Sequence, residues 1–124
     1  MTHKQTLDQQ RAQFAWRAAG TAQKELGTKF SAYRNLSKGA PAMIMGNVLM
    51  ASLAFYQSRG TKEAERLVLD LLGWLAKRGL KGSFAGAMSS LQEGDARFYM
   101  QQTEEALAVL RWLRQFADAV NTAE

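Results

Sequence analysis

Residues 40–58 read APAMIMGNVLMASLAFYQS and contain no charged side chain, although 22% of the chain is charged. Apolar side chains fall on every side of a helical wheel drawn through this stretch. A helix of that kind must be buried almost completely in a water-soluble fold. Pro41 suits a first helical position, where its missing N–H would have no partner. We therefore expect the other segments to surround this helix and to leave their basic side chains outside.

The spacing of apolar residues elsewhere predicts an all-α fold. Only one proline occurs, β-branched residues are sparse, and apolar residues recur three and four positions apart. We expect a single compact bundle of about five to six helices around the buried central helix. Residues 1–124 form one domain in this prediction, with 1–5 frayed. A chain of 124 residues can bury roughly two-thirds of its unfolded surface without disulfides or metal.

Glycines and capping residues divide the chain into expected helices at 6–26, 28–36, 41–58, from 61 to about 76, 83–91 and 95–120. Residues 37–40 are expected to turn the chain into the buried helix, and residues 77–82 to form a basic loop. Arg11 lies beside an apolar stripe, so we expect it to pair with a carboxylate of the last helix. Trp16 and Tyr33 should be the least buried aromatics, and the methionines should fill gaps in the core.

Groups that commonly carry catalysis are scarce. The chain has no cysteine, and its one histidine, His3, lies near the terminus. Neighbouring carboxylates such as Glu104 and Glu105 are too close in sequence to share a helix face as metal ligands. Glycine-rich phosphate loops are absent from the sequence. The pattern predicts no catalytic residue, no metal and no cofactor, and it indicates a binding or assembly module.

The charge balance favours an anionic partner. Sixteen Lys and Arg against eleven Asp and Glu give a net charge of +5 and a pI near 9.8. Basic residues on the 77–82 loop, at the ends of the 40–58 segment and on the last helix are the candidate nucleic-acid contacts: Lys38, Arg59, Lys62, Lys77, Arg78, Lys81, Arg111 and Arg114. Exposed helix faces carry such residues for solubility alone, so this alternative stays open.

We expect no membrane span. Residues 40–58 are long enough to cross a bilayer, but Gly46, Asn47, Ser52 and Gln57 dilute their hydropathy. Lys38 and Arg59 flank both ends, so the positive-inside rule favours neither orientation. The absence of cysteine suits a cytoplasmic protein, which is the expected location.

Five groups of short motifs follow one another over residues 10–119: Gln10-Arg11-Ala12, Pro41-Ala42-Met43-Ile44 with Leu53-Ala54-Phe55, Trp74-Leu75, Tyr99 with Thr103-Glu104-Glu105-Ala106-Leu107, and Trp112-Leu113-Arg114-Gln115-Phe116-Ala117. In their order and spacing, these motifs resemble the small-subunit family of type III-B CRISPR effector complexes, the Cmr small subunit. Two positions depart from the family pattern. Val48 stands where the family tends to have glycine, and Gln115 where it tends to have a basic residue.

The resemblance implies a noncatalytic helical subunit that acts in antiviral defence. It implies partners too: several copies would stack along the backbone subunits and near the large subunit, and would line the groove that holds guide RNA and target RNA. Base pairing reads the sequence there, so the protein needs only phosphate and sugar contacts. Three alternatives remain open: a purely structural helix–helix assembly protein, the analogous type III-A small subunit, and a small ribonuclease.

Overall fold

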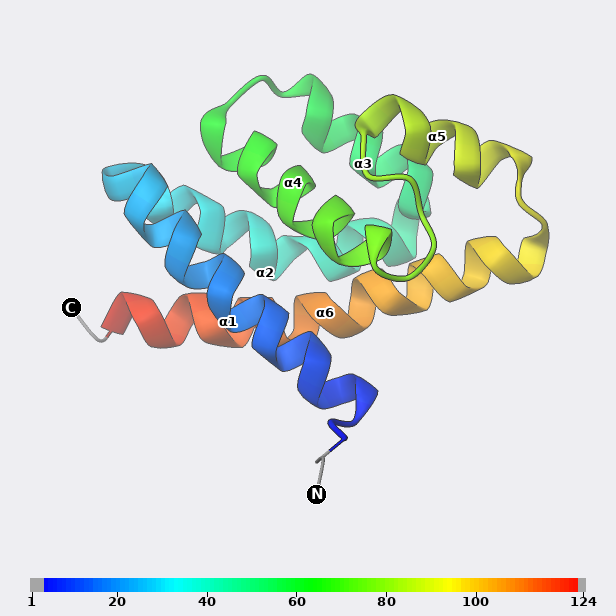
Figure 1. Ribbon diagram of the computed structural model, residues 1–124. Coiled ribbons are helices and arrows are strands. Elements are labelled where there is room, and N and C mark those ends of the chain that lie inside the picture. The colour runs from blue at the N-terminus through cyan, green and yellow to red at the C-terminus, as the bar shows by residue number, and fades with distance from the viewer. Residues whose placement is uncertain (1–3, 123–124) are drawn as a thin grey trace.

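The computed structural model describes the backbone of residues 4–122 and the side chains of residues 4–120. Within these residues the chain forms six α-helices, one short 3-10 turn and no strand, which confirms the all-α prediction (Figure 1). The elements are α1 (Leu7–Leu26), η1 (Gly27–Lys29), α2 (Phe30–Asn47), α3 (Leu49–Ser58), α4 (Lys62–Ala76), α5 (Phe84–Glu93) and α6 (Ala96–Thr122).

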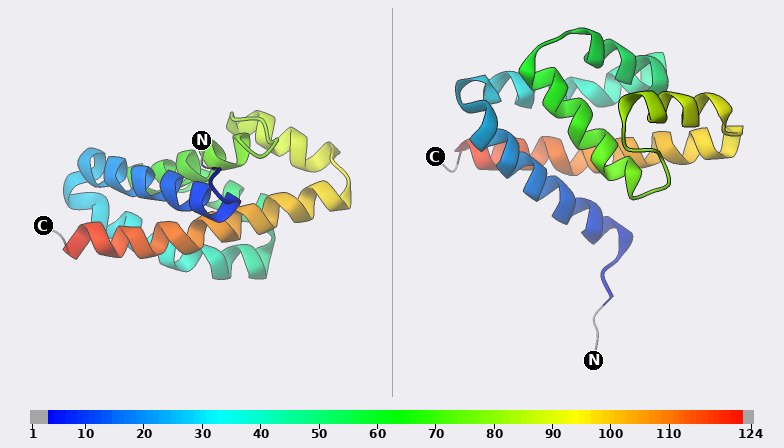
Figure 2. Two further views of the ribbon diagram at one scale, coloured as in Figure 1. Left: turned by 60° about the horizontal axis from the view of Figure 1, so that its bottom comes forward. Right: turned by 45° about the horizontal axis from the view of Figure 1, so that its top comes forward.

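The long helix α6 runs along one side of the molecule and packs against α1 and α2. In the left view of Figure 2, α1 lies on one side of α6 and α2 on the other. Helix α5 lies beside the first turns of α6 and buries Ala87 and Leu91 (Figure 1). The N-terminal and C-terminal halves of the chain are therefore joined mainly through α6.

The central, most buried helix is α4, which contacts α1, α2, α3 and α6. Thr61 caps it by accepting a hydrogen bond from the amide of Ala64, as the sequence predicts. Its inner face is buried and comprises Leu67, Val68, Leu71, Leu72, Trp74 and Leu75. The fold is thus a bundle around a buried helix, but that helix is not the uncharged segment 40–58.

The expectation that 41–58 forms one helix buried on all sides is wrong. Helix α2 begins at Phe30 and continues through the expected turn at 37–40 and through Pro41 as far as Asn47. The segment then breaks at Val48 and continues as α3. Only one face of each helix is buried, and Met45, Val48 and Phe55 are exposed.

Tertiary packing explains why α2 does not stop at Gly39 and Pro41. Its buried residues are Phe30, Tyr33, Ser37, Ala40 and Ile44, spaced alternately by three and four positions. This regular stripe lies against α4 and α6 and continues across the proline. Packing an apolar face outweighs the local cost of proline and glycine, since most helix stability in proteins comes from such packing.

Val48 has a backbone conformation that L-residues rarely adopt, with φ 60° and ψ 162°. This region is essentially reserved for glycine, and it costs other residues about 1–3 kcal/mol. The carbonyl of Val48 still accepts hydrogen bonds from the amide and hydroxyl of Ser52. The hydroxyl of Tyr99 accepts from the free amide of Met50 at 2.8 Å. Hydrogen bonds on the carbonyl of Val48 and on the amide of Met50 therefore stabilise the break between α2 and α3.

Two side-chain expectations are also corrected. Tyr33 is fully buried, because its hydroxyl donates to the buried carboxylate of Asp70 at 2.5 Å. Trp16 is exposed as predicted. Met43, Met50 and Met88 pack against the core as gap fillers, but Met45 and Met100 are exposed. Among the described residues, no helix combines the length and hydropathy needed to cross a bilayer.

Candidate nucleic-acid interface

A polar groove between α1 and α4 brings together two exposed cations. Two adjoining pockets of about 210 and 310 Å³ share Phe14, Arg17 and Lys77. The first pocket is also lined by Gln5, Gln10, Gln13 and Trp74, and the second by Ala18, Thr21, Arg66 and Asp70. Neither Arg17 nor Lys77 forms an ion pair within the described residues. Their charges remain available to an anion.

The floor of this groove depends on Gly73. A Cβ atom added there would lie 3.2 Å from the ring of Phe14, so the glycine lets Phe14 pack against α4. The Phe14 ring lies 5.5 Å from the ring of Trp74, centroid to centroid. Arg17 lies one turn beyond Phe14 on the rim of the groove. The two helices therefore hold the guanidinium and the ammonium over an apolar base.

A partly buried ion pair fixes α1 against α6 beside the groove. The guanidinium of Arg11 donates to both carboxylate oxygens of Glu105, at 3.0 and 2.7 Å. The indole of Trp74 donates to the same carboxylate at 3.0 Å. Burial acts to raise the pKa of Glu105, but the hydrogen bonds from Arg11 and Trp74 outweigh it and hold that pKa below its ordinary value. The predicted pairing of Arg11 with the last helix is confirmed.

A second network locks the other end of the groove. Arg66 donates to Asp70 at 2.7 Å and to Glu25 at 3.0 Å, which joins α4 to α1. Burial raises the pKa of Asp70, and the hydrogen bonds from Tyr33 and Arg66 oppose that shift. Because the charge of Arg66 is already compensated by two carboxylates, Arg17 and Lys77 supply the free positive charge of this groove.

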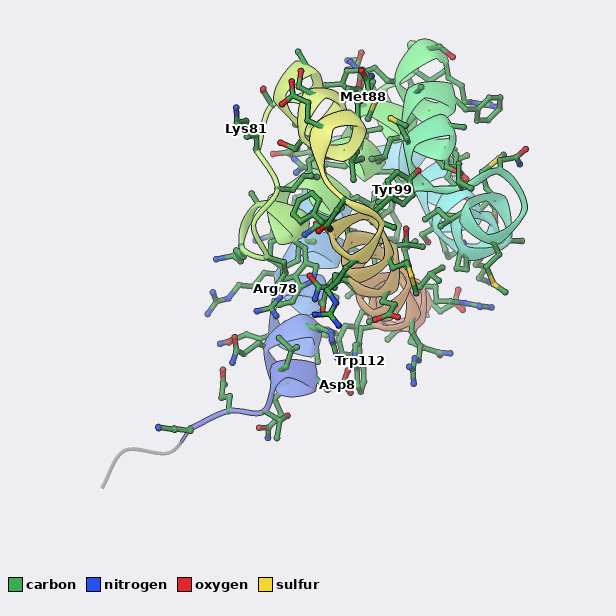
Figure 3. The ribbon with its side chains drawn as sticks, turned by 90° about the vertical axis from the view of Figure 1, so that its right-hand side faces the viewer. Asp8, Arg78, Lys81, Met88, Tyr99 and Trp112 are labelled. Carbon is green, nitrogen blue, oxygen red and sulfur yellow. The ribbon has the colours of Figure 1, made fainter. Side chains whose placement is uncertain are left out.

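The other two loop cations diverge from Lys77. The guanidinium of Arg78 lies 3.9 Å from Glu105 and so belongs partly to the Arg11 network. In Figure 3, Lys81 extends outward near α5, whereas Arg78 lies on the α1 side of the loop. Gln102 donates to the carbonyl of Arg78 at 2.8 Å and ties the loop to α6. The loop is therefore anchored, and only part of its charge adjoins the groove.

Three further candidates lie at separate places. The ammonium of Lys38 pairs with Asp118 at 3.0 Å, beside Arg34. The guanidinium of Arg59 lies 5.8 Å from the centre of the Phe55 ring. Lys62 lines a small groove with Glu25 and Glu65. None of these three lines the groove of Arg17 and Lys77.

Arg111 and Arg114 line a different, more apolar groove between α2 and α6, together with Pro41, Met45, Glu104, Leu107 and Ala108. Since α6 lies between α1 and α2, this groove and the α1–α4 groove are on different sides of the molecule (Figure 2). The structure thus brings Arg111 and Arg114 together, and Lys77 together with Arg17, but does not join the eight candidates into one surface.

Comparison with known proteins identifies the family. Residues 7–120 match the family model of the CRISPR-associated protein Cas_Cmr5. The chain belongs to the Cmr5 family. This is the small-subunit family of type III-B Cmr complexes, as the resemblance in the sequence indicates. The chain is 31% identical over 88 residues to the CRISPR system Cmr subunit Cmr5 of Thermus thermophilus, covering 71% of this chain and 74% of that protein.

The Cmr5 fold is conserved in a solved structure. The crystal structure of a CRISPR-associated Cmr5 family protein from Thermus thermophilus superposes with a TM-score of 0.81 and 28% identity. The match covers 94% of this chain and 97% of that one. The backbone at Val48 has a positive φ, a conformation that glycine adopts most readily and that would account for a tendency toward glycine at this position.

Sequence reasoning left Arg17 and Arg66 out of the candidate site. Arg17 is an exposed cation on α1 like several others, and nothing in the sequence indicates that it faces Lys77, sixty positions away. Arg66 adjoins the groove only because α1 and α4 pack together. The crossing of these helices, rather than any motif, creates the site.

Proposed function

We propose that this chain is the noncatalytic small subunit of a type III-B Cmr effector in the cytoplasm. Several copies stack along the backbone subunits and hold the paired guide and target RNA in antiviral defence. Family membership supports the assignment to the complex. The α1–α4 groove supports the contact with RNA, because it presents two uncompensated cations on a strongly basic chain.

The chemistry of the groove suits an RNA backbone. Arg17 and Lys77 can bind phosphate oxygens, and the amides of Gln10 and Gln13 can bind phosphate or ribose hydroxyls. Positions 10, 13, 17 and 21 of α1 follow one helical face over about 16 Å, the length of a short stretch of backbone. Such contacts carry no sequence preference, which suits a protein whose target is chosen by base pairing.

The remaining predicted cations have secondary places in this proposal. Arg78 and Lys81 extend the positive charge from Lys77 along the loop, while Lys38, Arg59 and Lys62 contribute to the overall field that attracts RNA. Arg78 and Lys38 face carboxylates at 3.9 and 3.0 Å, so their net contribution is smaller. Arg17 and Lys77 carry the direct contact.

Charge reversal tests the proposal in the assembled effector. We expect Arg17→Glu combined with Lys77→Glu to weaken target-RNA affinity at least about tenfold at physiological salt, because each copy loses two phosphate contacts. Lys29→Glu is the matched control, since Lys29 is exposed but lines neither groove, and it should change affinity by less than about twofold. The purified subunit alone should leave labelled RNA uncut.

A second candidate is a purely structural subunit, which the exposed Met45, Val48 and Met100 favour, because such side chains commonly mark protein contacts. On this reading the double reversal at Arg17 and Lys77 would assemble normally and bind target RNA like the wild type. That outcome would refute the proposed RNA contact and leave the structural role.

A further inference from the structure

The larger pocket of the α1–α4 groove has walls that do not suit a phosphate. This pocket, of about 310 Å³, adjoins the smaller one where Arg17 and Lys77 stand. Phe14 and Ala18 of α1 give it an apolar wall, and the carboxylate of Asp70 lies on the α4 side. A phosphate gains nothing from an apolar wall and is repelled by a carboxylate. The pocket therefore suits an uncharged, partly apolar group that is attached to a phosphate held by Arg17 and Lys77.

Two flat side chains line this pocket from different helices, Phe14 from α1 and Arg66 from α4. The ring of Phe14 is half-buried and lies 5.5 Å from the ring of Trp74, centroid to centroid. The guanidinium of Arg66 donates two hydrogen bonds to Asp70, at 3.1 and 2.7 Å, and one to Glu25 at 3.0 Å. Both groups are held in place by the protein itself, so neither has to be ordered when a ligand binds. Aromatic rings and guanidinium planes are the surfaces on which nucleobases stack.

The size of the pocket distinguishes a single base from a double helix. A volume of about 310 Å³ lies at the lower end of the range for small-molecule sites, about 300–1,000 Å³. One nucleobase fits in such a space, whereas the bases of a duplex are paired and stacked on one another, so their faces are covered. Only a nucleotide outside base pairing can place its base in the pocket.

We propose that the larger pocket binds the base of an RNA nucleotide that lies outside base pairing. The base stacks on Phe14 and Arg66, and Arg17 and Lys77 bind its phosphate. The RNA continues into the smaller pocket, where Gln13 can bind ribose hydroxyls. This inference rests on the proposed contact between the groove and RNA, and it adds a base to the backbone contacts. Stacking accepts every base, so the groove still has no marked sequence preference.

Cations alone do not make such a site, as the α2–α6 groove shows. Arg111 and Arg114 line one of its pockets, and among the described residues no aromatic ring lines that pocket. Tyr99 lines the adjoining pocket, which has no cation in the described part of its lining. In the α1–α4 groove a ring and two uncompensated cations line the same space. The proposal therefore concerns the α1–α4 groove alone.

Two small probes separate the base from the phosphate. Adenosine 5′-monophosphate and ribose 5-phosphate carry the same sugar phosphate, but only the first has a base. In nuclear magnetic resonance titrations of the full chain with up to about 10 mM probe, adenosine 5′-monophosphate should shift the amide signals of residues 13–21 and 66–77. We expect it to bind at least about fivefold more tightly than ribose 5-phosphate, because one stacked base contributes about that much affinity.

Phe14→Leu tests the stacking. This variant keeps an apolar side chain but removes the ring, so the preference for adenosine 5′-monophosphate over ribose 5-phosphate should fall at least about threefold. Phe55→Leu is the matched control, since Phe55 is exposed on α3 outside the groove, and it should keep the wild-type preference. Circular dichroism and an unchanged affinity for ribose 5-phosphate establish that Phe14→Leu is folded. The preference measured on the wild type needs no variant and stands by itself.

Three results would overturn the proposal: equal affinities of the two probes for the wild type, no binding of either probe, or a preference that Phe14→Leu leaves unchanged. The assembled effector then separates this inference from the proposed function. Phe14→Leu should weaken target-RNA affinity about threefold or more without changing its salt dependence, because it removes no phosphate contact. If only Arg17→Glu with Lys77→Glu has an effect, the groove contacts the RNA backbone and the base pocket is refuted. If neither variant has an effect, the proposed RNA contact fails as well.

Discussion

Replacing Val48 by glycine should make the protein more stable than replacing it by alanine. At an ordinary position in a helix the order is the reverse, since glycine costs about 1 kcal/mol relative to alanine. Val48 differs because its φ of 60° and ψ of 162° lie in a region essentially limited to glycine. Both variants lose the apolar side chain of valine, so the difference in stability between them reports the cost of the backbone conformation at position 48.

The magnitude follows from two opposing effects. Relief of backbone strain favours glycine by about 1–3 kcal/mol. The greater freedom of glycine in the unfolded chain opposes this by about 0.4–1 kcal/mol. We therefore expect the free energy of unfolding of Val48→Gly to be about 1 kcal/mol higher than that of Val48→Ala. For a chain of this size, this difference corresponds to about 4 °C in melting temperature. Ala51, exposed on α3, provides the reference, because Ala51→Gly should lower stability by about 1 kcal/mol.

Thermal and urea unfolding followed by far-ultraviolet circular dichroism measures all three variants. Tryptophan fluorescence should give the same transition, which establishes that unfolding is two-state. If Val48→Gly proves less stable than Val48→Ala by the amount seen at Ala51, the backbone at position 48 is not strained. The explanation given for the break between α2 and α3 would then be wrong.

Three further predictions concern the polar contacts between helices. Glu105→Gln should lower the free energy of unfolding by about 2–3 kcal/mol, because Arg11 loses its buried partner. Glu104→Gln, at the exposed neighbouring position, should change the free energy of unfolding by less than about 0.5 kcal/mol in dilute solution. Equal effects of the two variants in urea unfolding would contradict the assigned ion pair. The pKa of Glu105 lies below its ordinary value of 4.5, so the ion pair stabilises the fold above pH 4.5 and loses its contribution as the pH falls through the lowered pKa. The difference in free energy of unfolding between the wild type and Glu105→Gln should therefore become smaller below pH 4.5. A difference that grows below this pH would contradict a lowered pKa of Glu105. Tyr99→Phe should lower the free energy of unfolding by about 1 kcal/mol, because the variant removes the hydroxyl that accepts from the N–H of Met50. Hydrogen exchange of the Met50 amide should become faster. Unchanged exchange would show that this hydrogen bond is unimportant.

Local signals predicted where α1, α4 and α5 begin and where α1 ends. Thr6, Thr61 and Ser83 cap α1, α4 and α5, and Gly27 ends α1 with positive φ. These ends are set by hydrogen bonds between near neighbours, so the sequence contains the information. The pairing of Arg11 with α6 was predictable for a related reason, because an arginine beside an apolar stripe must find a carboxylate.

The path of α2 and the break at Val48 could not be predicted in the same way. Gly39 and Pro41 are local signals for a helix boundary, but the buried stripe from Phe30 to Ile44 overrides them. Val48 is a β-branched residue that ordinarily avoids positive φ. The resemblance marks position 48 as a departure from a family tendency toward glycine, but the sequence alone does not connect that departure with an unusual backbone.

The candidate site was predictable in its chemistry but not in its assembly. Charge counting identifies Lys77 as a candidate, yet its neighbour Arg17 belongs to another helix far away in the chain. Arg111 and Arg114 look equivalent to Lys77 in sequence, but they line a groove with exposed methionines on another side. The distinction depends on how α1, α2 and α4 pack around α6.

The salt dependence of target-RNA affinity in the assembled effector tests the proposed RNA contact most directly. Wild-type affinity should fall linearly with salt on logarithmic axes. The double variant Arg17→Glu with Lys77→Glu should show a slope shallower by about two for each small-subunit copy that contacts RNA, since each lost phosphate contact removes about one counterion. The Lys29→Glu control should keep the wild-type slope. Identical slopes for the wild type and the double variant would contradict the assignment of the α1–α4 groove to the RNA backbone.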